Sequence, residues 1–100
     1  MSNLVKYSLV GSLILISLQA LANHSEARPS AVTIAHVCES CHGASGHGVG
    51  AIPSIANMPE QQFIITMQEY REGRRLATVM NRIARGYQDQ DFVNLARFFR

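Results

Sequence analysis

The segment Cys38-Glu39-Ser40-Cys41-His42 contains both cysteines of the 100-residue chain, in a C-x-x-C-H pattern. This pattern is typical of covalent haem attachment. If residues 32–41 are helical, Cys38 and Cys41 lie on one face, where their sulfur atoms can reach the two vinyl groups of one porphyrin. His42 continues that face and can bring an imidazole nitrogen to the iron. We therefore expect one covalently bound haem c, with thioether bonds to both cysteines and His42 as an iron ligand.

Three other uses of a C-x-x-C pair fit this sequence less well. A thiol–disulfide oxidoreductase requires a βαβ context, and this sequence does not alternate strands with helices. A zinc site could draw on His36, His42 or His47, but the chain lacks a second ligand pair at the spacing of a zinc finger. A structural disulfide would close a very small loop and leave His42 unexplained.

Length and composition exclude several classes of protein. A chain of 100 residues holds one domain at most, which excludes large enzymes and repeat arrays. The formal net charge of +2 is too small for the clustered basic surface of a nucleic-acid-binding domain. Two cysteines cannot form a disulfide-dense scaffold. We expect no nucleic-acid partner.

Residues 1–22 have the pattern of a secretory signal peptide. Lys6 precedes an uncharged apolar run from Leu9 to Leu18, which is followed by the small-residue site Ala20-Leu21-Ala22. These are the three parts of a cleavable export signal. We therefore expect cleavage near Ala22, a mature cytochrome domain at residues 23–100 and a periplasmic location. The alternative is a retained anchor, because the apolar segment has about the minimum length that spans a bilayer. A membrane partner is expected only in that case.

The remaining sequence predicts an all-α fold, in which three to five helices wrap around the haem. Ser30 is suited to cap a first helix that ends at Gly43, before a glycine-rich loop. Further helices are expected from Pro59-Glu60 to Gly73, over residues 76–84, and from Asp89 as an N-cap.

The second axial ligand of the iron has to come from another methionine or histidine. The candidates are Met58, Met67, Met80, His24, His36 and His47. Met67 has the helical spacing of a core residue. Met80 lies far enough after His42 for a helix to cross the haem and return on its far side. The sequence favours Met80 and leaves Met58 open as the alternative.

Several segments together resemble class I c-type cytochromes, and within them the cytochrome subunit of flavocytochrome c sulfide dehydrogenase. They are Cys38 to Gly43 (CESCHG), the glycine loop, Pro53 to Ala56 (PSIA) and Ala77 to Tyr87 (ATVMNRIARGY). The resemblance covers nearly all of residues 31–99 and implies a small cytochrome c fold in its single-haem form. It also implies that Met80 is the distal ligand. The Pro53 carbonyl would accept the N–H of the proximal imidazole, which would fix the ring and raise its basicity.

These expectations lead to a one-electron carrier that is not an enzyme on its own. Iron bound by His42 and Met80 has no vacant position, and methionine ligation raises the reduction potential. The resemblance implies a haem subunit that accepts electrons from a sulfide-oxidising flavoprotein. The alternatives are a free shuttle between redox complexes and a gas sensor in which Met80 dissociates. Five arginines around Met80 are expected to be solvated, or to pair with haem propionates or an acidic partner: Arg71, Arg74, Arg75, Arg82 and Arg85.

Overall fold

The computed structural model describes residues 27–100, so the expected signal peptide at residues 1–22 lies outside the described residues. The described part is helical, with one isolated β-bridge between Val49 and Ile52 and no strand. Its elements are α2 (Ala31–His42), the short 3-10 helix η1 (Ala44–Gly46), α3 (Glu60–Arg71), α4 (Met80–Ala84) and α5 (Asp89–Phe98). The predicted all-α fold is confirmed. Within the same residues, every helix is too short or too polar to cross a membrane.

Helix α2 begins and ends where the sequence predicts. The Ser30 side chain accepts a hydrogen bond from the Thr33 amide (3.2 Å), which satisfies one of the free amides of the first turn. At the other end Gly43 has a φ of +80°, a conformation that glycine adopts without strain, and its amide donates to the Glu39 carbonyl. The helix therefore stops directly after His42.

Helix α4 is shorter than predicted. The sequence indicated a helix over residues 76–84, but α4 starts at Met80, and Val79 before it is non-helical (φ −131°, ψ −27°). Leu76 is fully exposed, so no burial of apolar surface supports an additional turn. Thr78 and Val79 are also β-branched, which lowers their helix propensity.

The start of α5 also corrects one detail of the prediction. Gln88 occupies the capping position that was expected for Asp89, and Asp89 is the first helical residue. The Gln88 amide donates a hydrogen bond to the Asp91 carboxylate (2.7 Å), so the acid that stabilises this helix start lies inside the first turn.

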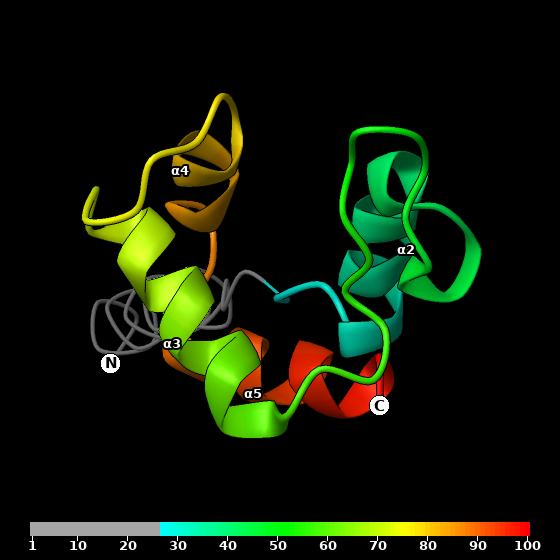
Figure 1. Ribbon diagram of the computed structural model, residues 1–100. Helices are drawn as coiled ribbons and strands as arrows, with labels where there is room; N and C mark the ends of the chain where they lie inside the picture. The colour runs from blue at the N-terminus through cyan, green and yellow to red at the C-terminus, as the bar shows by residue number, and fades with distance from the viewer. Residues whose placement is uncertain (1–26) are drawn as a thin grey trace, which may run out of the picture.

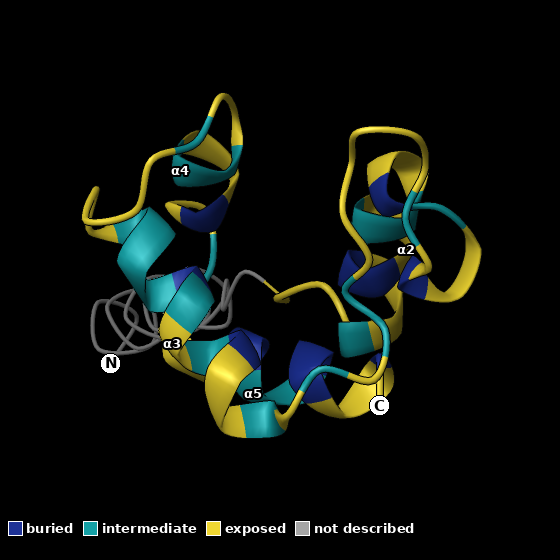
Figure 2. Cartoon of the chain, in the orientation of Figure 1, coloured by how far each residue is buried: buried dark blue, intermediate teal, exposed yellow. Residues whose placement is uncertain are grey.

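The hydrophobic core lies where α5 packs against α2 and α3. Phe92 and Leu95 of α5 are fully buried, and Phe63 of α3 stacks on Phe99 with ring centroids 6.5 Å apart. Helices α2 and α4 rise on opposite sides of this base (Figure 1), and the buried residues gather around α5 (Figure 2). The arrangement leaves a space between α2 and α4.

Candidate haem-binding site

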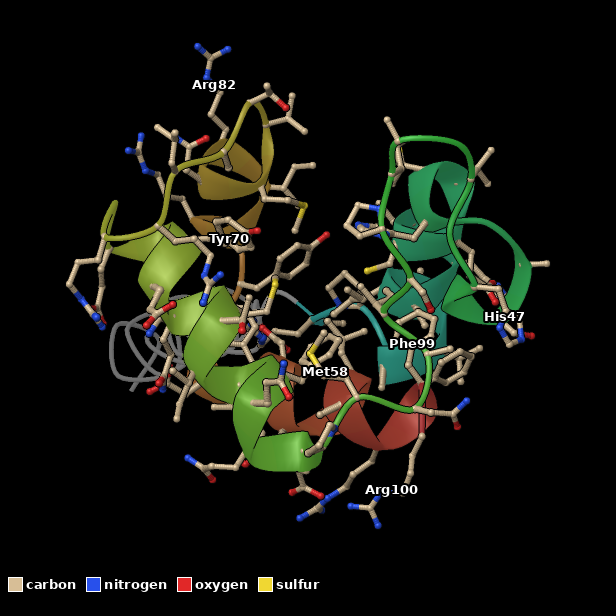
Figure 3. The ribbon with its side chains drawn as sticks, viewed as in Figure 1. His47, Met58, Tyr70, Arg82, Phe99 and Arg100 are labelled. Atoms are coloured by element: carbon tan, nitrogen blue, oxygen red, sulfur yellow. The ribbon has the colours of Figure 1, made fainter. Side chains whose placement is uncertain are left out.

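A cavity of about 940 Å³ lies between α2 and its following loop on one side and α3 and α4 on the other. Its lining includes all the site residues that the sequence predicts: Cys38, Cys41, His42, Pro53 and Met80. Met58 and Tyr70 line it as well (Figure 3). Small-molecule sites have volumes of roughly 300–1,000 Å³, so this cavity is at the upper end of the range. The fold thus brings segments that are distant in sequence to one site.

His42 presents one ring nitrogen to this cavity. Its side chain is buried, and its Nδ1 lies 2.6 Å from the Pro53 carbonyl oxygen. A carbonyl oxygen only accepts hydrogen bonds, so Nδ1 carries the proton and Nε2 keeps its lone pair. A histidine held in this way has a fixed ring and a free Nε2, which is the usual preparation of a histidine for binding a metal.

The loop that brings Pro53 to His42 depends on Gly48. The Gly48 amide donates to the His42 carbonyl (2.6 Å), and its φ is +88°. A Cβ at this position would lie 2.8 Å from the Ser54 nitrogen and 2.9 Å from the Ile52 oxygen, on the two sides of Pro53. Only glycine fits here without shifting the backbone that carries the Pro53 carbonyl.

The two cysteines are free thiols and differ in exposure. Cys38 is half-buried, and this burial raises the pKa of its thiol, whereas Cys41 is exposed. A thiol–disulfide oxidoreductase needs a cysteine of lowered pKa, so the surroundings of Cys38 disfavour that alternative. Within residues 27–100, no three His, Cys, Asp or Glu side chains are grouped as metal ligands. The zinc alternative therefore lacks a ligand set in this part of the chain.

The three methionines of the described residues all border the cavity: Met58, Met67 and Met80. Met67 is buried in the hydrophobic core, as its helical spacing predicted. Met80 is the first residue of α4. Val79, just before it, and Ile83, within the same helix, have exposed side chains that also line the cavity. Met80 as the distal ligand stays a prediction, with Met58 as the rival.

The remaining histidines of residues 27–100 lie away from the cavity lining. His36 Nδ1 lies 2.7 Å from the Glu39 carboxylate. This hydrogen bond, together with one from the Ser45 amide, holds the pKa of Glu39 below its usual range. His47 borders a separate, smaller pocket of about 280 Å³. Neither residue is therefore placed to bind an iron inside the cavity, whereas His24 lies outside the described residues.

Sequence reasoning missed Gln62 and Thr66 of the cavity lining, whereas it named Arg75 among the expected partners of the haem propionates. Gln62, Thr66 and Tyr70 recur every four residues along α3, and all three line the cavity. Arg75 follows α3, lies 5.7 Å from the centroid of the Tyr70 ring, and reaches the cavity too. The spacing could have revealed this face of α3, but its mixed polarity gave no hydrophobic signal.

The arginines around Met80 do not act as one group. Arg74 and Arg75 form ion pairs with Glu69, and Arg74 also pairs with Glu72. Arg71 binds the Asp89 carboxylate and lies over the Phe92 ring, 5.0 Å from its centroid. Its guanidinium, with a hydrogen bond from Gln68, lowers the pKa of Asp89. Arg82 and Arg85 have no carboxylate partner within residues 27–100.

The chemistry of the lining fits a haem. One wall offers two thiols and a histidine with a free Nε2, and the other wall offers methionine sulfur. Ile52, Val79 and Ile83 line the cavity and are more than a third exposed, so a flat apolar ring would cover surface that is otherwise open to water. The residues therefore suit a porphyrin that is bound through two thioethers and ligated from both sides.

Comparison with known proteins agrees with this fit. The cytochrome c family model matches residues 27–100. Over 62 residues the chain is 32% identical to the cytochrome subunit of sulfide dehydrogenase from Chlorobaculum tepidum, covering 62% of this chain and 56% of that protein. Over 92 residues it is 28% identical to cytochrome c4 of Pseudomonas aeruginosa, covering 91% and 46% of the two chains.

A third relative is cytochrome c-554(548) of Halomonas halodenitrificans. The identity is 29% over 66 residues, which cover 62% of this chain and 80% of that protein. The chain spans about half the length of the first two relatives.

Proposed function

Because the chain belongs to the cytochrome c family, with a covalently bound haem c and an electron-carrying role, we propose that His42 and Met80 are the axial ligands of its iron. Cys38 and Cys41 supply the two thioethers, and the Pro53 carbonyl orients the His42 ring. The observation that carries this proposal is the single cavity lined by all five residues. The bound haem supplies a centre that gains and loses one electron.

The protein's own residues keep that centre rigid and shielded from water. The hydrogen bond from His42 Nδ1 to Pro53 fixes the ring and leaves Nε2 as the coordinating atom. Methionine ligation and an apolar surrounding both favour the reduced state, and so raise the reduction potential. With both axial positions filled by the chain, outer-sphere electron transfer is the remaining chemistry.

The proposed electron donor is a flavoprotein that oxidises sulfide, and the proposed compartment is the periplasm, after cleavage near Ala22. Similarity to a sulfide dehydrogenase subunit supports the donor, and the apolar leader supports export. Copurification of the tagged holoprotein with a flavoprotein is the expected result. Isolation as a lone monomer from cells that oxidise sulfide would favour the free shuttle.

The ligation proposal is tested on the exported protein by intact mass and by an alkaline pyridine spectrum. Together these measurements give the haem type, the number of thioethers and the site of signal cleavage. A colourless product with the mass of the bare peptide would refute the proposal. Slow or absent binding of carbon monoxide to the reduced protein is expected, because rapid binding would instead indicate a gas sensor.

A further inference from the structure

The three sides of helix α4 have different surroundings. Met80 and Ile83 line the haem cavity. Arg82 is exposed and extends outward from the helix (Figure 3). Ala84 is fully buried in the hydrophobic core, and Asn81, three residues before it, lies on the same side of the helix. The side of α4 that faces the core therefore carries one polar residue.

Asn81 brings a buried oxygen atom to that side. Its Oδ1 is shielded from solvent and has no hydrogen-bond partner among residues 27–100. No other buried side-chain nitrogen or oxygen of the described residues is in this situation. A buried polar atom without a partner destabilises the fold, because the hydrogen bonds that it makes with water in the unfolded chain are lost. This oxygen therefore calls for a donor.

The chain that leads into α4 has backbone donors to offer. None of the amides of residues 76–79 donates to a backbone carbonyl of the described residues. Helix α4 also lacks a side-chain cap, whereas at the start of α5 the Gln88 amide donates to the Asp91 carboxylate inside the first turn (2.7 Å). Asn81 is the second residue of α4, so its oxygen likewise belongs to a first turn that follows free amides.

We propose that Asn81 is a positioning residue for Met80, and that its Oδ1 accepts a hydrogen bond from a backbone amide of residues 76–79 when Met80 ligates the iron. This inference rests on the proposed function. Val79 is exposed and lines the cavity, so a haem there covers it and gives residues 76–79 a surface to pack on. Helix α4 has only five residues, so one hydrogen bond across its first turn restricts where Met80 can lie.

The test measures how firmly the ferric holoprotein holds Met80. Imidazole binds the iron only where Met80 has left it, and its binding is followed by loss of the ferric sulfur-to-iron absorption band. Asn81→Leu removes the oxygen but keeps a side chain of similar size, whereas Asn81→Asp keeps an acceptor. Loss of one hydrogen bond should make Asn81→Leu bind imidazole about tenfold more tightly than the wild type, and Asn81→Asp should stay within about twofold.

Asn94→Leu is the matched control, because Asn94 is also half-buried but lies on α5, away from the cavity lining. It should change the imidazole affinity by less than about twofold. Unchanged or weaker imidazole binding by Asn81→Leu would overturn the proposal, since an apolar group replaces an unpartnered oxygen without loss. Equal tightening in Asn81→Leu and Asn81→Asp would overturn it as well, because the acceptor would then be irrelevant.

Hydrogen exchange of the reduced holoprotein, followed by NMR, identifies the donor. One amide of residues 76–79 should exchange at least about tenfold faster in Asn81→Leu than in the wild type, and equal exchange of all four would contradict the proposal. Met80→Ala separates this inference from the proposed function. An absorption band that survives in Met80→Ala refutes the ligation by Met80, whereas a band lost there together with unchanged imidazole affinity in Asn81→Leu refutes only the role of Asn81.

Discussion

The two walls of the haem cavity are built in different ways. On the α2 side, backbone hydrogen bonds hold the loop after α2 in place. The Gly48 amide donates to the His42 carbonyl, and the Gly46 carbonyl accepts from the amides of Ile55 and Ala56. On the α4 side, no amide in residues 76–81 donates to a backbone carbonyl, and the helix has five residues. The α2 wall is thus organised by the polypeptide alone, whereas the α4 wall depends on what packs against it.

Removing the haem tests this difference most severely. Replacing Cys38 and Cys41 together by serine should abolish covalent haem and, with it, the packing partner of Val79 and Ile83. Helix content by circular dichroism should fall, with the loss concentrated in α4. Intact mass reports attachment, and Ser40→Ala is the matched control, because its hydroxyl only contacts α2 itself. Covalent haem in the double variant would contradict the attachment scheme.

Replacing the proposed distal ligand should affect the α4 wall alone. Met80→Ala should open a coordination position and lower the reduction potential by on the order of 0.1 V, within the ~0.8 V range that axial ligands span. The ferric sulfur-to-iron absorption band should disappear, while Met58→Leu should retain it. The opposite pattern would identify Met58 as the ligand.

Gly48→Ala should disturb the α2 wall and leave the α4 wall intact. The new Cβ would meet backbone on both sides of Pro53, and the left-handed φ adds strain, so we expect a loss of about 2–4 kcal/mol in unfolding free energy. Gly50→Ala is the control, because its φ is also positive (+54°) but no atom lies within 4 Å of its Cβ. It should lose only about 1–2 kcal/mol in chemical denaturation. Equal losses would show that contact around Pro53 is unimportant.

The smallest effect on stability is expected from removing the ion pair between Arg71 of α3 and Asp89 at the start of α5. Arg71 donates to the Asp89 carboxylate and to the Tyr87 carbonyl. Because the pKa of Asp89 is lowered in the folded state, its contribution to stability is present near neutral pH. This contribution is lost as the pH falls below the ordinary value of 3.8 and through the lowered one.

Asp89→Asn should therefore be slightly less stable than the wild type at neutral pH, and the difference should vanish in acid. Denaturation midpoints across this range are the measurement. Glu72→Gln provides the comparison, because Glu72 pairs with Arg74 only two residues away and ties no two elements together. A difference between Asp89→Asn and wild type that persists at the lowest pH would show that charge is not its cause.

The parts of the fold that the sequence predicted are those fixed by neighbouring residues. The cap at Ser30, the stop at Gly43 and the spacing of the two thiols all act within a few residues, so α2 could be predicted with its boundaries. The start of α4 could not, because an extra turn at Leu76 would have needed a packing partner that the chain does not provide there.

The same reasoning explains what was missed at the site. Gln62 and Thr66 line the cavity only because α3 crosses one side of it, a tertiary arrangement that polar residues do not encode in a hydrophobic pattern. The choice between Met58 and Met80 is likewise tertiary, since both border the same space.

The hydrogen bond between His42 and Pro53 spans only 11 residues of chain. The backbone hydrogen bonds between Gly46 or Gly48 and their partners lie before α3, so substitutions in α4 are expected to alter the proposed distal side of the iron while the His42 side keeps its geometry. The part of the chain that retains the haem is therefore separate from the part that adjusts its reduction potential. Substitutions in α4 are therefore expected to change the reduction potential without loss of the haem.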